Sequence, residues 1–236
     1  LRDAFESRDR MVEAASSQMK RRVDNQYVEW FDECVQGNRM SLALQPIVER
    51  DGRTHAAYEA LLRSNHPILD SPLAILRMAE EHNRIQELGG SVFELAAERV
   101  VQIPAHRELF VNMHPTQLSD PDRLVRSIQP LVPHAHRITL EITERSRLSD
   151  LDHWDASVEW VRELGFSMAV DDLGAGYNSL TMLADLQPKY IKLDMSLVRR
   201  IHEEPRKQRL VQLMVTFAEA TDARVIAEGV EEQAEA

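Results

Sequence analysis

The sequence predicts an α/β fold in which parallel strands alternate with helices around a barrel. Three observations support this: six short apolar runs each end in a polar residue, stretches with helical periodicity lie between most of these runs, and 236 residues suit one barrel domain. The runs end in Glu59, Asn112, Glu141, the pair Asp171–Asp172, Lys192 and Glu228. In a parallel barrel every strand points the same way, so strand-end residues converge on one face. Six of them in succession therefore predict a functional site.

The strands are predicted from the apolar runs, because stretches that match helices lie between most of them, as in a βα repeat. Their expected ranges are 41–48, 54–62, 108–112, 137–142, 166–171, 189–193 and 223–227. These are seven strands rather than eight, and the sequence stops at Ala236, inside what we expect to be the last helix. Either a C-terminal strand is missing from this sequence or the barrel is open at that edge.

Helices are predicted where apolar residues recur at three- and four-residue spacing. Their expected ranges are 72–83, 88–102, 121–131, 151–164, 178–185 and 195–220. Prolines fall at the edges of these elements or in loops, where a missing backbone N–H does least harm.

Residues 1–37 form a separate predicted segment. Apolar residues recur there at helical spacing among dense charges, and Gly37 follows as a helix stop. The segment either packs against the barrel or carries a signal from an upstream domain, and both can hold for different parts of it. We therefore divide the chain into a helical linker over 1–37 and a barrel over 38–236. Because the sequence starts at Leu1 rather than Met, we expect a piece of a longer protein.

Composition excludes several classes of protein. Lys and Arg number 28 against 39 Asp and Glu, a formal net charge of -11, which argues against a binder of polymeric nucleic acid. Cys34 is the only cysteine, which indicates a reducing compartment. The sequence has no apolar stretch of about 18 residues, and nothing at its N-terminus looks like a signal peptide. We expect a cytoplasmic protein, or the cytoplasmic part of a membrane-bound parent protein.

Four of the strand ends offer only oxygen atoms as ligands: Glu59, Asn112, Glu141 and Asp171. Oxygen ligands favour hard cations such as Mg2+ or Mn2+ over zinc. Asp172 follows Asp171 directly, so Asp171 could bridge two cations while Asp172 holds the second. Two cations about 3.5–4 Å apart form the clamp used for in-line attack on phosphorus. The pattern predicts a site for two divalent cations.

Lys192 and Glu228 are the remaining strand-end residues. A lysine at the end of an apolar strand is costly unless it is paired, so Lys192 either forms a salt bridge with one of the acids or acts on water or phosphate. Glu228 precedes Gly229, which gives the backbone room to turn beside a ligand. Glu228 could therefore bind a metal or accept a proton from water.

These residues lie within motifs that resemble the EAL domain, a family that hydrolyses the bacterial messenger cyclic di-GMP. The resemblance covers about residues 40–233, with seven motifs in matching order and spacing. The motifs are Gln45–Pro46–Ile47, Glu59–Ala60–Leu61–Leu62–Arg63, Val111–Asn112, Glu141–Ile142–Thr143–Glu144, Asp171–Asp172–Leu173–Gly174–Ala175–Gly176, Lys192–Leu193–Asp194 and Glu228–Gly229–Val230–Glu231.

The resemblance implies a modified (β/α)8 barrel, similar to a TIM barrel, whose first strand is antiparallel. It implies hydrolysis of cyclic di-GMP to linear pGpG, with Glu228, Lys192 and Glu59 as the catalytic residues. The implied metal ligands are Glu59, Asn112, Glu141, Asp171, Asp172 and Glu228.

The resemblance also assigns residues around the metal site. Gln45, Arg63 and Asp194 match positions that contact the substrate, and Glu144 matches the residue that anchors the loop bearing Gly174. A homodimer is expected by the same resemblance, as is an upstream sensor or GGDEF domain in the parent protein. Two other functions remain open: an inactive receptor that binds cyclic di-GMP without cutting it, and a barrel hydrolase for another phosphoester.

Overall fold

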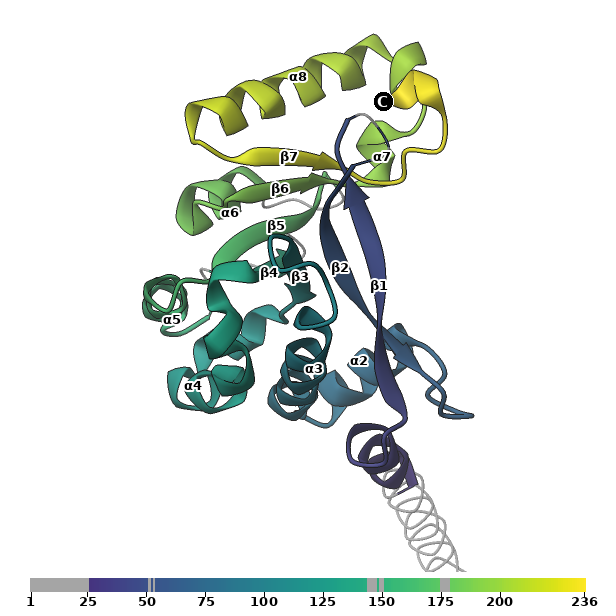
Figure 1. Cartoon of the computed structure of the whole chain (residues 1–236), viewed down its shortest axis with the longest axis vertical. Coiled ribbons are helices and arrows are strands. Elements are labelled where there is room, and N and C mark those ends of the chain that lie inside the picture. The colour runs from purple at the N-terminus through teal and green to yellow at the C-terminus, as the bar shows by residue number, and fades with distance from the viewer. Residues whose placement is uncertain (1–25, 51, 53, 144–147, 149–150, 175–178) are drawn as a thin grey trace, which may run out of the picture. The chain divides into compact units, whose positions relative to one another are not determined.

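Seven strands form one sheet and follow one another in the order of the chain (Figure 1). They are β1 (Met40–Val48), β2 (His55–Ser64), β3 (Glu108–Asn112), β4 (Ile138–Thr143), β5 (Ser167–Leu173), β6 (Tyr190–Leu193) and β7 (Arg224–Ala227). The first strand runs antiparallel to the rest, and β2 to β7 are parallel. The predicted fold class, a TIM-like barrel with an antiparallel first strand, is confirmed.

The computed structural model describes residues 26–50, 52, 54–143, 148, 151–174 and 179–236. The chain divides into two compact units. The first comprises Leu1–Ser41 and Leu62–Arg84, and the second comprises Leu42–Leu61 and Ile85–Ala236. Within the described residues no helix combines the length and the apolar character needed to cross a bilayer.

Helices follow most of the strands, as predicted. The α-helices are α2 (Pro72–Glu81), α3 (Ile85–Val100), α4 (Pro121–Ile128), α5 (Trp154–Glu163), α6 (Ser179–Leu186), α7 (Met195–Val198) and α8 (Pro205–Ala220). Short 3-10 helices are η1 (Pro115–Ser119), η2 (Gln129–Arg137), η4 (Ile201–Glu203) and η5 (Gln233–Glu235). Figure 1 shows α8 lying along β7, against which it packs.

The prediction of one helix over 195–220 is wrong. The structure divides this stretch into α7, η4 and α8. Arg200 adopts a left-handed backbone conformation with φ of 56°, and Pro205 begins α8, where its missing N–H is harmless. The apolar periodicity continues across the breaks and therefore conceals them.

In the first unit, the helix at residues 26–35 packs on the segment that follows β2. Asp32 forms an ion pair with Arg84 at 2.6 Å, and Glu33 lies 3.3 Å from Nε2 of the buried His66. The Nδ1 atom of His66 accepts the N–H groups of Ile68 and Leu69. Since Nδ1 accepts, the proton is on Nε2, and His66 therefore donates to Glu33.

In the second unit, an apolar cluster fills the inner face of the sheet. It consists of Ala57, Phe110, Ala169 and Tyr190, with Ile47 and Ile226 packed against it. At the amino-terminal ends of the strands, Glu108 accepts hydrogen bonds from the Tyr190 and Thr139 hydroxyl groups and pairs with Lys189 at 2.8 Å. The cluster separates this polar end from the carboxyl ends of the strands.

Candidate metal centre

Four carboxylates surround the ammonium group of Lys192 at the carboxyl ends of the strands. The Nζ atom lies 2.7 Å from Glu141, 2.8 Å from Glu228, 2.9 Å from Asp171 and 3.3 Å from Glu59. The side chains of Lys192 and Glu141 are 1% and 0% exposed, whereas that of Glu228 is 28% exposed. Residues far apart in the sequence therefore form one compact group of charges that opens toward solvent at Glu228.

The period of the strands explains this convergence. Side chains two residues apart on a strand lie on the same face of a sheet. Five of the predicted residues each come two positions after a member of the apolar cluster or a residue packed on it. These pairs are Ala57 and Glu59, Phe110 and Asn112, Ala169 and Asp171, Tyr190 and Lys192, and Ile226 and Glu228. Glu141 pairs in register with both Asn112 and Ala169, which puts it on that face too.

A β-bulge brings the second aspartate to the same side. Val170 pairs with Ile191 and Leu173 with Leu193, so β5 has one more residue than β6 between these two pairs. Asp172 adopts a left-handed φ of 58° within the bulge. Adjacent strand residues normally point to opposite faces, yet Asp171, Asp172 and Glu228 each offer an oxygen within 4.8 Å of the others. The bulge therefore allows two neighbouring acids to serve one site.

Burial and mutual repulsion determine the electrostatics of the group. Burial opposes the charge on Lys192, but the carboxylates of Glu141, Asp171, Glu59 and Glu228 outweigh it and raise the pKa of the ammonium group. Burial raises the pKa of Glu141 well above its usual value, against the effect of Lys192. Burial likewise raises the pKa of Glu228, and Asp171 and Glu59 add to the shift. At Glu141 and Glu228, burial together with repulsion from the other acids therefore outweighs the attraction of the single ammonium group.

The donor atoms fit a hard divalent cation. Both oxygens of Glu141 and Oδ1 of Asp171 are buried, and none accepts a well-aligned hydrogen bond from the described residues, although Lys192 lies at ion-pair distance. Buried carboxylate oxygens normally have such partners. Asp171 is one of three residues, with Asp172 and Glu228, that offer carboxylate oxygens within 4.8 Å of one another, and such a set is suited to binding Mg2+, Mn2+ or Ca2+.

The other predicted site residues lie at varied places. Asn112 is exposed at the end of β3, beside Glu141 in the sheet register. Gln45 is exposed on β1, two residues before Ile47. The Asp194 carboxylate caps α7 by accepting the Ser196 N–H at 2.8 Å.

Two predicted residues are not placed at this centre. Arg63 belongs to the first unit, where its guanidinium group donates to the Leu62 carbonyl. Glu144 lies outside the described residues. The substrate contact of Arg63 and the loop-anchoring role of Glu144 stay predictions.

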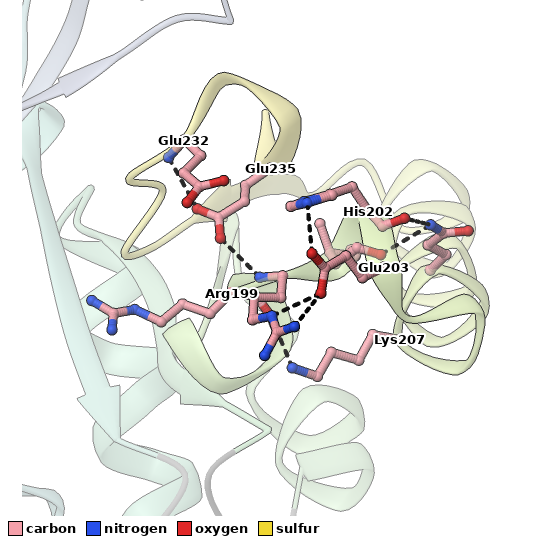
Figure 2. Close-up of polar contacts among 9 residues, drawn as sticks. Arg199, His202, Glu203, Lys207, Glu232 and Glu235 are labelled. Atoms are coloured by element: carbon pink, nitrogen blue, oxygen red, sulfur yellow. Dashed lines mark hydrogen bonds and ion pairs between the residues drawn. The ribbon is translucent and has the colours of Figure 1, made fainter.

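The loop that follows Glu228 is fastened to the segment that follows α7 (Figure 2). The Glu235 carboxylate accepts the N–H groups of Arg200, Glu231 and Glu232 at 2.8, 2.9 and 3.1 Å, and these bonds lower its pKa to about 2. Arg199 forms an ion pair with Glu231. Sequence reasoning missed Arg199 and Glu235 because no periodicity connects residues about 35 positions apart.

Gly229 allows the close approach of these two segments. It has a φ of 64°, and a Cβ atom there would lie 2.6 Å from Cβ of Met195. We expect Gly229→Ala to displace Glu228 and to lower the rate of a reaction at this centre by about tenfold or more, because 1 Å errors in positioning can cost about a hundredfold. Gly52→Ala is the matched control, since Gly52 has a φ of 65° and a Cβ atom there would meet no other atom within 4 Å. Steady-state rates should fall only for Gly229→Ala; equal losses would exclude the steric explanation.

Several known proteins resemble this chain. A model of the EAL domain matches residues 28–236. The cyclic di-GMP phosphodiesterase RocR of Pseudomonas aeruginosa is 32% identical over 196 residues, covering 79% of this chain and 50% of RocR. The cyclic di-GMP phosphodiesterase PdeR of Escherichia coli is 31% identical over 217 residues, covering 86% of this chain and 32% of PdeR.

A solved structure extends the likeness to three dimensions. The calcium and cyclic di-GMP complex of BlrP1 from Klebsiella pneumoniae is 31% identical, with a TM-score of 0.72, and the match covers 84% of this chain and 51% of that one. The chain spans half or less of the length of RocR and PdeR.

Proposed function

This chain belongs to the EAL domain family, and from that premise we propose that it hydrolyses cyclic di-GMP to linear pGpG with the help of divalent cations. The observation that carries the proposal is the convergence of carboxylates around Lys192, with the bulge that adds Asp172. The names of RocR and PdeR and the ligands of the BlrP1 complex support the same substrate.

Two cations suit the charge of the centre. Four carboxylates surround one ammonium group and the carboxylate of Asp172 lies close to two of them, so two divalent cations would offset much of this negative charge. The proposed ligands are Glu59, Asn112, Glu141, Asp171, Asp172 and Glu228. Bound Mg2+ or Mn2+ would supply positive charge that activates a water molecule and stabilises phosphate oxygens.

Glu228, Lys192 and Glu59 have different proposed roles in the reaction. Glu228 is the most exposed of the four carboxylates near Lys192, so it can accept a proton from a water molecule that enters from solvent. The Lys192 ammonium group orients that water or stabilises charge on the phosphate. Glu59 would hold a cation from its position within β2.

Substrate contacts are assigned to Gln45, Arg63 and Asp194. The planar guanidinium group of Arg63 fits two phosphate oxygens at once. Glu144 anchors the loop bearing Gly174, and two copies of the chain form a homodimer.

The proposed cellular setting follows from the domain division. The segment 1–37 would link an upstream sensor or GGDEF domain to the barrel at 38–236 and carry its signal. The single Cys34 agrees with a cytoplasmic site of action.

An assay with Mn2+ or Mg2+ and cyclic di-GMP tests this function. We expect chromatography to detect pGpG and expect EDTA to suppress it. Glu228→Gln should keep substrate binding and lower the rate by about a hundredfold or more, since general acid–base groups contribute about 10²–10⁴-fold. Calorimetric binding of cyclic di-GMP without product would identify a receptor instead. Absence of binding would favour a hydrolase for another phosphoester.

A further inference from the structure

A buried amide holds the turn that follows Asn112. Gln117 lies in η1 with only 1% of its surface exposed, and its Oε1 atom accepts the N–H of His114 at 3.0 Å. His114 is the N-cap of η1 and comes two residues after Asn112. A side chain in the turn therefore controls the backbone just past the end of β3.

The Gln117 bond continues the hydrogen bonding of the sheet. The Met113 N–H, just past the end of β3, donates to the Glu141 carbonyl of β4 at 2.9 Å. The next amide along the chain is that of His114, and Gln117 accepts it. Asn112 thus precedes two consecutive fixed amides.

Packing alone does not explain an amide at this position. The Nε2 atom of Gln117 is buried and has no hydrogen-bond partner in the part of the chain that the structure describes. Burying such a group costs free energy, so an apolar side chain of equal size would suit the core as well or better. The contact that distinguishes glutamine from an apolar residue is the one to His114.

Helix α3 makes room for this amide. Gly89 lies buried within α3, and a Cβ atom there would be 2.1 Å from Nε2 and 2.6 Å from Oε1 of Gln117. Glycine inside a helix is unfavourable relative to alanine. Gly89 is thus explained by the space that the Gln117 side chain needs.

We propose that Gln117 is a positioning residue for Asn112. By fixing the His114 amide, Gln117 holds the end of β3 so that the Asn112 side chain stays beside Glu141 for cation binding. This inference rests on the proposed function, in which Asn112 is a metal ligand. Residues that orient a ligand typically change metal affinity by about 10–100-fold when they are replaced.

Calorimetric titration with Mn2+, in the absence of substrate, tests the inference. Gln117→Met keeps the size of the side chain and removes the acceptor, and it should weaken Mn2+ binding by about tenfold or more. Ser157→Ala is the matched control: it removes the 2.7 Å hydrogen bond from Ser157 to the Leu118 carbonyl in the same turn. Ser157→Ala should lower Tm without changing Mn2+ affinity, because it leaves the His114 amide bonded.

Gly89→Ala supplies an independent route, since it displaces the Gln117 amide without removing it. It should weaken Mn2+ binding as Gln117→Met does, and it carries the test if Gln117→Met does not fold. Unchanged Mn2+ affinity in the folded variants, beside normal binding by the unaltered protein, would overturn this inference alone. Failure of the unaltered protein to bind Mn2+ would overturn the proposed metal centre and this inference together.

Discussion

Replacement of Lys192 by methionine is expected to abolish the proposed hydrolysis of cyclic di-GMP and to destabilise the metal-free protein. Four carboxylates lie within 3.3 Å of its Nζ atom, and Glu141 is fully buried beside it. Removing one partner of a buried ion pair typically lowers the free energy of unfolding by about 3–5 kcal/mol. In a protein of this size each kcal/mol lowers Tm by about 2–4 °C, so we expect a loss of roughly 10 °C.

Thermal unfolding with and without Mn2+ measures this effect. Because cations can replace the missing positive charge, Mn2+ should raise Tm more for Lys192→Met than for the unaltered protein, while turnover stays absent. Lys189→Met is the control, since Lys189 also pairs with a glutamate at 2.8 Å but is 44% exposed. Solvent-exposed ion pairs contribute about 0–1 kcal/mol to the free energy of unfolding. Equal Tm losses for both variants would show that the positive charge of Lys192 does not stabilise the folded protein against repulsion among the surrounding acids.

The sequence alone predicted the strands and which polar residues on or just after them share one face. Strand residues alternate between two faces, so an apolar residue such as Ala169 or Tyr190 determines the face of the residue two positions later. That is why Asp171 and Lys192 meet on the inner face. Parallel direction then brings the ends together without knowledge of any side-chain contact.

The bulge in β5 could not be read from periodicity. A strict strand would separate Asp171 from Asp172, and only the register shift at Val170 and Leu173 with a positive φ at Asp172 places both at one site. Two adjacent acids with Gly174 two residues later are compatible with a bulge, but the same sequence fits an ordinary loop equally well.

Contacts between loops were also beyond sequence reasoning. Arg200 donates its backbone N–H to Glu235, and Gln117 accepts that of His114. Backbone amides are present at every residue except proline, so no residue type marks the position at which one is bonded. Such contacts become visible only when the chain is folded.

Replacement of Glu59 by alanine is expected to abolish turnover and to leave the fold intact. Glu59 makes the longest of the four contacts to Lys192, at 3.3 Å, and its side chain is 14% exposed. Its charge raises the pKa of both Glu141 and Glu228, which means that it repels them. Removing it therefore costs the metal-free protein little, with a Tm change of about 2 °C or less, because Lys192 keeps three closer partners.

Glu141→Ala separates metal binding from stability. Its side chain is fully buried and lies 2.7 Å from Lys192, so its loss leaves both a cavity and a less compensated buried ammonium group. Glu59→Ala and Glu141→Ala should each weaken Mn2+ binding in calorimetry by more than about tenfold and abolish production of pGpG. Only Glu141→Ala should also lower Tm, by several degrees. Full activity of Glu59→Ala would remove it from the proposed ligands. A large Tm loss for Glu59→Ala would mean instead that the attraction between Glu59 and Lys192 stabilises the fold. Repulsion between Glu59 and the other acids could not cause such a loss, because removing it would raise Tm.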